Sequence, residues 1–422
     1  MKYLFRSDLV MSKRTIALLA MLWIVIITSL VTYTLAMSRA EVAYNEFSAR
    51  VTEEGVLVTR EQYDMIERYE RLQFVLDIVN ENYYTSVDQD ALLTGAVRGL
   101  LNSLGDPYTF YYTPEEMSNR NDHSAGTYEG VGIQLIEGKN GELIITRAFK
   151  DGSALEMGIR AGDIIIAVDG RPVNAETTLS MNEAIALIKG EPGQYVEITV
   201  SRGNEILPFK VQRRTVTINR VEHKMLEHDI GYIALYEFMG DDVTGFKSAL
   251  NALKDAKGLI IDLRSNPGGY LDDVLKIADM ILPEGLIVYT EDRAGVRENH
   301  YSDPAALNKP LAVLVNGMTA SASEILAGAV QDYGVGTIVG EKTFGKGVVQ
   351  TLIPFRVDGA GVQLTTSTYF TPKGRSINKV GIEPDVVVPY DPGTEAVSGL
   401  SPDSDPQLRK AIDILISELS EE

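Results

Sequence analysis

Ser321 and Lys346 are the two residues whose sequence contexts could support catalysis. Ser321 lies in Thr-Ala-Ser-Ala-Ser-Glu-Ile (319–325), just after the apolar run 311–315, and Lys346 lies in the glycine-flanked segment 340–350. A serine hydroxyl is a weak nucleophile until a base removes its proton, and lysine serves as that base when burial lowers its pKa. The pair therefore predicts a serine hydrolase with a lysine general base.

Ser321 also has a purely structural interpretation. With Glu324 it forms Ser-x-x-Glu, the pattern of a helix capping box, followed by apolar residues at helical spacing. The two roles are compatible, because a serine at a strand-to-helix turn lies beside free N–H groups and the positive end of the helix. The N–H of Ala322 is then expected to be one donor to a developing oxyanion.

A second oxyanion donor is expected from Asp-Leu-Arg-Ser-Asn-Pro-Gly-Gly (262–269), which follows an apolar run predicted to be a buried strand. In the functional interpretation the N–H of Gly268, or that of Gly269, completes the oxyanion hole. An ordinary turn is the alternative, because Asn-Pro and Gly-Gly both interrupt regular structure. The sequence leaves these two interpretations open.

Nucleotide binding and a histidine-based triad are alternative chemistries. Residues 340–346 match the start of a P-loop, but Gly347 replaces the expected Ser or Thr, and 348–354 predicts a strand where a helix should follow. A Ser-His-Asp triad stays open, because triads assemble from distant positions. No metal or other cofactor is expected, since metal-ligand spacing is missing among the four histidines, His123, His223, His228 and His300.

Composition narrows the classes of partner. The 422 residues carry a net charge of −20, which argues against nucleic acid, because nucleic-acid binders present basic patches. The chain contains no cysteine, which excludes disulfides, thiolate catalysis and cysteine-bound metals.

The N-terminal region predicts a membrane anchor. Residues 1–15 form a basic N-terminus, and 16–37 is an uncharged stretch long enough to cross a bilayer as a helix. The basic flank predicts a cytoplasmic N-terminus and an extracytoplasmic catalytic part. A cleaved signal peptide, with a cleavage site at 36–38, is the alternative. The expectation is an uncleaved, single-pass anchor in the cell membrane.

Residues 41–126 and 391–422 are predicted to form helices and linkers. Residues 41–112 are predicted to form a helical region, with apolar residues at helical spacing in 63–79 and a second helix over 90–104. The polar stretch 113–126 is expected to be a loop. Residues 391–422 predict an acidic linker followed by a C-terminal helix.

Residues 113–213 are interpreted as a linker and a PDZ domain. Their order of short strands, a glycine-containing turn, a helix and a closing strand resembles a PDZ module of the bacterial protease type. Such modules typically add a peptide to a sheet edge and hold its C-terminal carboxylate. The main-chain N–H groups of Val131, Gly132 and Ile133 are expected to bind that tail, since glycine lets the backbone approach. A β-turn without a ligand is the alternative.

Residues 214–390 alternate predicted strands and helices, which indicates an α/β core. In such sheets, catalytic groups tend to lie at the carboxyl ends of strands. Ser321 follows the predicted strand 310–316, and Lys346 follows 334–340, so both are expected at such ends.

Taken together, these segments resemble the carboxyl-terminal processing peptidases, which are PDZ-containing serine peptidases with a Ser-Lys dyad. The resemblance spans about 65 to 415 and rests on five motifs: Leu-Gly-Asp-Pro-Tyr-Thr (104–109), Asp-Leu-Arg-x-Asn-Pro-Gly-Gly (262–269), Ala-Ser-Ala-Ser-Glu-Ile (320–325), Thr-Phe-Gly-Lys-Gly-x-Val-Gln (343–350) and Thr-Pro-x-Gly-Arg (371–375). Thr319, just before the third motif, departs from the family pattern, which often has serine there.

The resemblance implies roles for individual residues. Ser321, rather than Ser323, is the nucleophile, Lys346 is the base and Gln350 orients the lysine. It also implies a Clp-protease/crotonase-like α/β peptidase core with an inserted PDZ domain, a homodimer, and a PDZ gate that aligns the dyad when a substrate tail binds. The expected function is a serine endopeptidase that cleaves proteins recognised by their C-terminal tails. A non-catalytic PDZ adaptor and a lipid or ester hydrolase are the alternatives.

The proposed chemistry requires a large change in the pKa of Lys346. Free lysine titrates near ~10.4, whereas a general base works best near ~7–8. Burial against Phe344, Val348 and Val349 is expected to supply the change. Activity is therefore expected to fall in mild acid and to need no metal.

Overall fold

The computed structural model describes residues 21, 27–29, 31, 32, 34, 51, 52, 55, 56, 59–124, 126–137, 142–149, 151–173, 181–304, 307–389 and 405–421. The chain divides into two compact units, 1–93 and 94–422. None of the helices in the described part is long and apolar enough to cross a membrane. The predicted basic N-terminus and most of the predicted anchor, 16–37, lie outside the described residues, as does most of the predicted acidic linker.

The first unit contains a two-stranded antiparallel pair and a long helix. The pair is β1 (Val51–Thr52) with β2 (Gly55–Val56), and the helix is α2 (Arg60–Asn82). Thr59 and Gln62 form a reciprocal capping box that starts α2. Helix α3 (Gln89–Asn102) spans the boundary between the units. The two helices predicted for this region are confirmed.

The expectation of a loop over 113–126 is wrong, because α4 (Pro114–Ser124) occupies most of it. Thr113 and Glu116 exchange hydrogen bonds between side chain and backbone, at 2.8 and 3.3 Å, and Pro114 occupies the first helical position. These are strong helix-start signals, and they outweigh the polar composition. The short strand β3 (Phe110–Tyr112) precedes this helix.

The predicted PDZ module contains one sheet with strand order β10-β9-β7-β6-β5, and β8 pairs with β7. Strand β5 lies at the edge of this sheet, so one side of its backbone is available for pairing. Strands β4 and β11 pair antiparallel where the chain enters and leaves the module. The elements are β4 (Thr127–Gly130), β5 (Ile133–Glu137), β6 (Leu143–Ala148), α5 (Ser153–Glu156), β7 (Ile164–Val168), β8 (Arg171–Pro172), α6 (Met181–Ile188), β9 (Tyr195–Arg202), β10 (Glu205–Gln212) and β11 (Arg214–Thr217).

The predicted α/β core is built on a sheet with strand order β12-β13-β14-β17-β18-β21, in which all neighbours except β12 and β13 are parallel. The strands are β12 (Val221–Met225), β13 (Ile230–Leu235), β14 (Gly258–Asp262), β17 (Leu311–Val315), β18 (Thr337–Gly340) and β21 (Val386–Val387). The helical elements are η1 (Glu227–Asp229), α7 (Asp242–Ala252), α8 (Leu271–Asp279), α9 (Ala322–Tyr333) and α11 (Pro406–Glu421).

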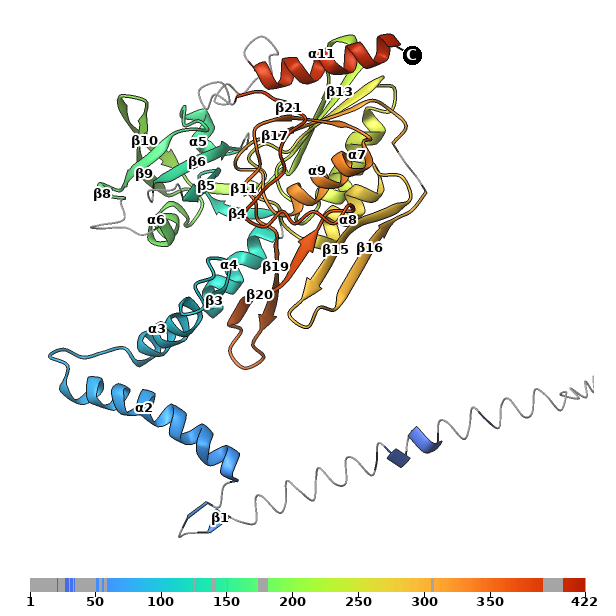
Figure 1. Ribbon diagram of the computed structural model, residues 1–422. Helices are drawn as coiled ribbons and strands as arrows, with labels where there is room; N and C mark the ends of the chain where they lie inside the picture. Colours follow the sequence, from blue (N-terminus) through green and yellow to red (C-terminus); the bar gives the residue numbers. More distant parts are fainter. Residues whose placement is uncertain are drawn as a thin grey trace, which may run out of the picture. The chain divides into compact units, whose positions relative to one another are not determined.

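Both faces of this sheet are buried, which explains its continuous apolar runs. In β17, Leu311, Val313 and Val315 pack with α7, α8 and α9, whereas Ala312 and Leu314 pack with α11. Helix α11, drawn in red in Figure 1, covers its face with Leu408, Ala411 and Leu415, so the predicted C-terminal helix is confirmed.

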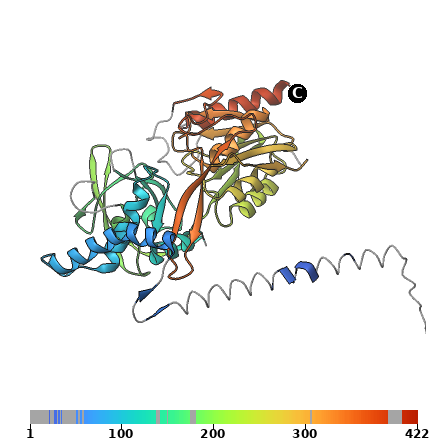
Figure 2. The ribbon, with the colours of Figure 1, turned by 60° about the horizontal axis from the view of Figure 1, so that its bottom comes forward.

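A second sheet has strand order β16-β15-β20-β19, with β3 beside β20. Its strands are β15 (Gly285–Asp292), β16 (Arg297–Ser302), β19 (Val348–Pro354) and β20 (Gly361–Phe370). Strands β19 and β20 form the long orange hairpin in Figure 2. In the sequence, Lys346 lies between β18 of the first sheet and β19 of the second sheet.

Candidate active site

Segments that follow three parallel strands meet beside Ser321. Strands β14, β17 and β18 are neighbours in register, so their carboxyl ends lie at one edge of the sheet. The segment after β14 carries Gly268, the one after β17 carries Ser321, and the one after β18 carries Lys346. The structure thus brings together residues that are far apart in the sequence.

Ser321 occupies a strained turn immediately before α9. Its backbone has φ 57° and ψ −117°, a conformation that non-glycine residues rarely adopt. The predicted capping box is present, and Glu324 Oε2 accepts the Ser321 N–H at 2.9 Å. This turn directs Ser321 to the helix N-terminus, where Ala322 is the first helical residue and its N–H lacks an intrahelical acceptor.

Ser323 has a different environment from Ser321. Ser323 is fully buried, and its hydroxyl donates to the backbone oxygen of Asn266 at 3.0 Å. Ser321 is only half-buried. Of these two serines, Ser321 is therefore the one that a substrate can reach.

The carboxylate of Glu324 joins the serine turn to the lysine segment. It is fully buried and accepts four hydrogen bonds, from the N–H groups of Ser321, Gly345 and Lys346 and from the Thr343 hydroxyl, at 2.6 to 2.9 Å. Burial raises the pKa of Glu324, and the four hydrogen bonds oppose that effect. Sequence reasoning recognised only the bond within the cap and missed the other three.

Tyr369 on β20 makes a second bridge between the same two residues. Its buried hydroxyl lies 3.0 Å from the Ser321 carbonyl oxygen and is also hydrogen-bonded to the carbonyl oxygen of Lys346. The backbones of Ser321 and Lys346 are therefore held by a carboxylate at their N–H groups and by a phenol at their carbonyl groups.

Lys346 lies in a largely buried site. Burial lowers the pKa of its ammonium, and the charges of Asp106 and Glu324 oppose this effect. The Nζ atom lies 4.6 Å from the centre of the Tyr108 ring. Phe344, one of the three residues expected to bury the lysine with Val348 and Val349, is itself 56 % exposed. The cover comes from Tyr108, in the 104–109 motif, to which the sequence assigned no role.

Asp106 is held in place by its own neighbours. Its carboxylate accepts the Thr109 hydroxyl at 2.6 Å and the Tyr108 N–H at 3.1 Å. Burial alone would raise the pKa of Asp106, but hydrogen bonds from Thr109 and Thr365, with a contribution from the Lys346 charge, leave it lowered. Asp106 is therefore ionised at neutral pH and favours the protonated form of Lys346.

Gln350, on β19, donates to the Thr365 hydroxyl at 3.2 Å. Thr365 in turn interacts with Asp106, so Gln350 contacts the group of residues around the lysine. Its expected role in orienting Lys346 stays a prediction.

Gly268 lies so close to Ser321 that a side chain at position 268 would collide with it. A Cβ atom at this position would lie 2.8 Å from Ser321 Cβ and 2.8 Å from the Ala322 nitrogen, and φ is +100°. The Gly268 N–H donates to the Asn266 side chain at 2.8 Å. Gly268 must release this bond before its N–H can serve as the expected oxyanion donor.

Hydrogen bonds connect the 263–269 segment to the segment that carries Ser321. The sequence alone assigns Asn266 only the role of a residue that interrupts regular structure. The Asn266 carbonyl accepts the Ala320 N–H, and its amide donates to the Leu235 carbonyl. The Asn316 side chain accepts the Ser265 N–H at 2.9 Å.

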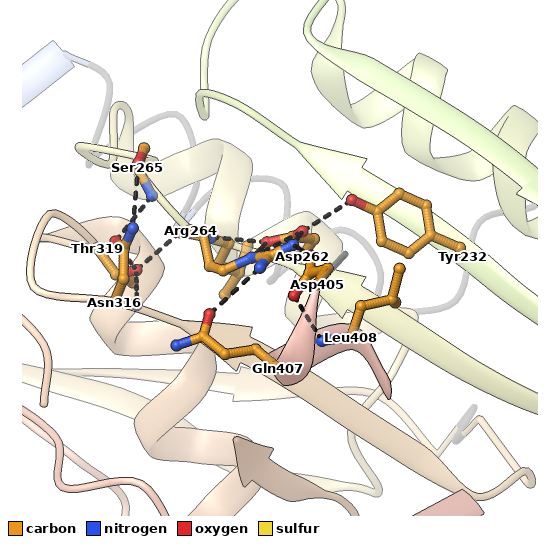
Figure 3. Close-up of polar contacts among 10 residues, drawn as sticks. Tyr232, Asp262, Arg264, Ser265, Asn316, Thr319, Asp405, Gln407 and Leu408 are labelled. Carbon is orange, nitrogen blue, oxygen red and sulfur yellow. Dashed lines mark hydrogen bonds and ion pairs between the residues drawn. The ribbon is translucent and has the colours of Figure 1, made fainter. Parts of the chain in front are cut away.

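Arg264, at the base of the same segment, connects it to α11 (Figure 3). Its guanidinium is almost fully buried and pairs with Asp262 at 2.6 Å and Asp405 at 2.8 Å. Gln407 accepts a further hydrogen bond from it, and Tyr232 donates to Asp262. The C-terminal helix is therefore tied to the segment that carries Gly268.

The nucleotide-binding alternative is wrong. A P-loop requires a helix after its lysine, but β19 follows Lys346. A side chain at Gly347 would also collide with the backbone of Asn378, 2.3 Å away.

The predicted tail-binding residues lie where the chain enters β5, and Ile133 is the first residue of that strand. Gly132 has φ +87°, and a Cβ there would lie 2.4 Å from the Gly152 Cα, so only glycine fits. The Val131 carbonyl accepts the Ala154 N–H, and the Gly132 carbonyl accepts the Phe149 N–H. The Ile133 N–H donates to the Tyr128 hydroxyl at 3.0 Å.

Known proteins share these parts. Residues 229–388 match peptidase family S41, 144–202 match a PDZ domain, and 25–116 match the N-terminal domain of the activating protease CtpB. The chain is 34 % identical over 343 residues to a carboxy-terminal-processing protease of Bartonella bacilliformis, covering 79 % of this chain and 77 % of that one. It is 34 % identical over 324 residues to the carboxy-terminal processing protease CtpA of Bacillus subtilis, covering 76 % and 68 %.

The photosystem II D1 C-terminal processing protease has a similar structure, with a TM-score of 0.59, 30 % identity and coverage of 80 % of this chain and 95 % of that one. The fold is thus a mixed α/β peptidase with a PDZ insert and an N-terminal helical domain. The chain belongs to the carboxy-terminal processing proteases of family S41, which are serine-type enzymes. Because the chain belongs to a family of serine proteases, the alternatives of a non-catalytic PDZ adaptor and of a lipid or ester hydrolase are set aside.

Proposed function

We propose that this protein is a membrane-anchored serine endopeptidase that cleaves proteins outside the cytoplasmic membrane, with Ser321 as nucleophile and Lys346 as general base. One observation carries the assignment of these roles. The buried carboxylate of Glu324 binds the N–H groups of both residues, while burial lowers the pKa of the Lys346 ammonium.

The reaction follows from these groups. The neutral amine of Lys346 takes the hydroxyl proton as Ser321 Oγ attacks the scissile carbonyl carbon. The N–H groups of Ala322 and Gly268 stabilise the tetrahedral oxyanion, once Gly268 has left Asn266. The new ammonium, stabilised by Tyr108 and Asp106, passes its proton to the leaving amine. Water activated by the neutral amine then hydrolyses the acyl-enzyme.

Substrate selection is assigned to the PDZ domain. A protein tail adds to the free edge of β5, and its carboxylate is held by the N–H groups of Val131, Gly132 and Ile133. Occupancy of this site aligns Ser321 and Lys346, with Gln350 orienting the amine.

Anchoring and assembly rest on the sequence and on the resemblance. The uncharged stretch 16–37, with its basic flank, supports a single membrane span and an extracytoplasmic catalytic part. A homodimer is the proposed assembly.

A serine-reactive fluorophosphonate probe tests the assignment of the nucleophile. The full-length protein is expected to be labelled, and Ser321→Ala is expected to lose the label while it unfolds at the same temperature. Ser323→Ala is the matched control and should keep the label, because its hydroxyl is buried against Asn266. Undiminished labelling of Ser321→Ala would refute the assignment.

A further inference from the structure

The hydroxyl of Tyr128 lies on the loop to which we assign the tail carboxylate. Its oxygen accepts the Ile133 N–H at 3.0 Å, and the hydroxyl lies 3.3 Å from the Ile133 carbonyl oxygen. Burial raises the pKa of Tyr128, and hydrogen bonds from the backbones of Ile133 and Gly132 partly oppose this. One of the three N–H groups assigned to the carboxylate, that of Ile133, therefore already has the phenol oxygen as its acceptor.

Packing holds the Tyr128 ring in this position. A Cβ atom on Gly130 would lie 2.8 Å from the ring, so the ring rests directly on the backbone of that glycine. The ring also makes an edge contact with Phe149, at a centroid distance of 6.3 Å. Both contacts involve the ring carbons, so they do not require the hydroxyl.

The loop beneath the phenol is closely packed. Gly132 has a φ of +87°, a conformation that favours glycine. Val131 is fully buried and Ile133 nearly so, and Gly152 packs against Gly132. These contacts hold the backbone of the loop beneath the phenol.

We propose that the Tyr128 hydroxyl is a built-in competitor for the C-terminal carboxylate, and that a protein tail binds only after the Tyr128 side chain swings away and its hydroxyl releases the Ile133 N–H. The proposal rests on the tail recognition described above. A carboxylate forms charge-assisted hydrogen bonds, which are shorter and stronger than those of a neutral phenol, so a free tail displaces it. The uncharged carbonyl of an internal segment gains little over the phenol.

Tyr128→Phe tests this directly, because it removes the hydrogen bond to the loop and preserves the ring contacts with Gly130 and Phe149, so the side chain leaves the loop at a lower cost. The full-length chain carries Ser321→Ala so that the probe stays intact. The probe is a fluorescein-labelled decapeptide that ends in valine with a free carboxylate, and binding is followed by fluorescence anisotropy. We expect Tyr128→Phe to lower Kd about 2- to 10-fold, the effect of one net hydrogen bond. Tyr301→Phe, at an exposed tyrosine of β16, should leave Kd unchanged.

The outcomes separate this inference from the proposed function. An equal or higher Kd in Tyr128→Phe, with the free-carboxylate probe still bound better than its amidated form, overturns the competitor role alone. If the acid and amide forms bind equally, or neither binds, tail recognition fails and the inference fails with it.

A second measurement covers the case in which Tyr128→Phe does not fold. 3-Fluorotyrosine is placed at position 128 alone in the full-length protein by amber-codon suppression, so its single ¹⁹F signal needs no variant for its assignment. Saturating free-carboxylate peptide should shift that signal, and amidated peptide at the same concentration should not. An unchanged signal with bound peptide would overturn the proposal.

Discussion

Glu324 accepts the backbone N–H of Lys346 at 2.9 Å, although the two residues are 22 positions apart in the sequence. The same carboxylate oxygen accepts the Ser321 N–H. One buried group at the third position of α9 therefore joins the backbones of the proposed nucleophile and the proposed base. A cap that would usually only stabilise a helix here also connects the two proposed catalytic residues.

Glu324→Gln should damage activity more than folding. An amide offers one acceptor oxygen in place of two, and its NH₂ group would face backbone donors, so the serine turn and the lysine segment would separate. We expect kcat on an unstructured protein substrate to fall about 10²-fold, the typical effect of a misplacement of about 1 Å. Glu383→Gln removes an exposed carboxylate and is the control. Wild-type kcat in Glu324→Gln would show that the bridge is dispensable.

Gly268→Ala should abolish most activity, because its new Cβ would press on Ser321 Cβ and on the Ala322 nitrogen. Gly295→Ala is a matched control, since Gly295 also has a positive φ, +78°, but no atom lies within 4 Å of a Cβ placed there. Both variants carry a backbone strain of about 1–2 kcal/mol. We expect only Gly268→Ala to lose about 10²-fold or more in kcat/KM. Equal losses in the two variants would assign the effect to strain alone.

Asp106→Asn should move the pH profile in a defined direction. Burial lowers the pKa of Lys346 and the Asp106 charge opposes it, so removal of that charge lowers the pKa further. The base works in its neutral form, and activity is lost as the pH falls through its pKa. The acid limb of kcat/KM should therefore move to lower pH, whereas Asp272→Asn, at an exposed site, should leave it in place. A shift toward higher pH would contradict this account.

Asp405→Ala should loosen the attachment of α11. Asp405 pairs with Arg264 at 2.8 Å and accepts the Leu408 N–H at 2.9 Å, at the start of the helix (Figure 3). We expect the free energy of unfolding to fall by about 2 kcal/mol in chemical denaturation, from the lost cap and ion pair. Asp413→Ala, on an exposed face of the same helix, should cost about 0.5 kcal/mol or less. Similar losses would show that the contact with Arg264 contributes little.

The strand-to-helix turn at Ser321 and the strand after Lys346 were predictable, because each depends on local apolar patterns and on glycine and proline signals. Helix α4 was missed because its composition is polar, although Thr113, Pro114 and Glu116 carry a clear start signal. Local capping chemistry was the better guide there than average polarity.

The environment of Lys346 could not be read from its neighbours in the sequence. Phe344 was expected to cover the lysine, but Tyr108 covers it from more than 200 residues away. The bonds from Glu324 to Gly345 and Lys346 likewise depend on which strands become neighbours in the sheet. Periodicity predicts which strands exist, but it leaves their order and side-chain contacts undetermined.

The most direct test of the central claim is the titration of the Lys346 amine itself. Lysines labelled with ¹³C at Cε are followed by NMR in the full-length protein as the pH is raised, and the Lys346 signal is identified by its loss in Lys346→Arg. We predict that this signal titrates at a clearly lower pH than the signals of exposed lysines, because burial disfavours its ammonium. A Lys346 signal that titrates together with the exposed lysines would contradict the role of Lys346 as a neutral base.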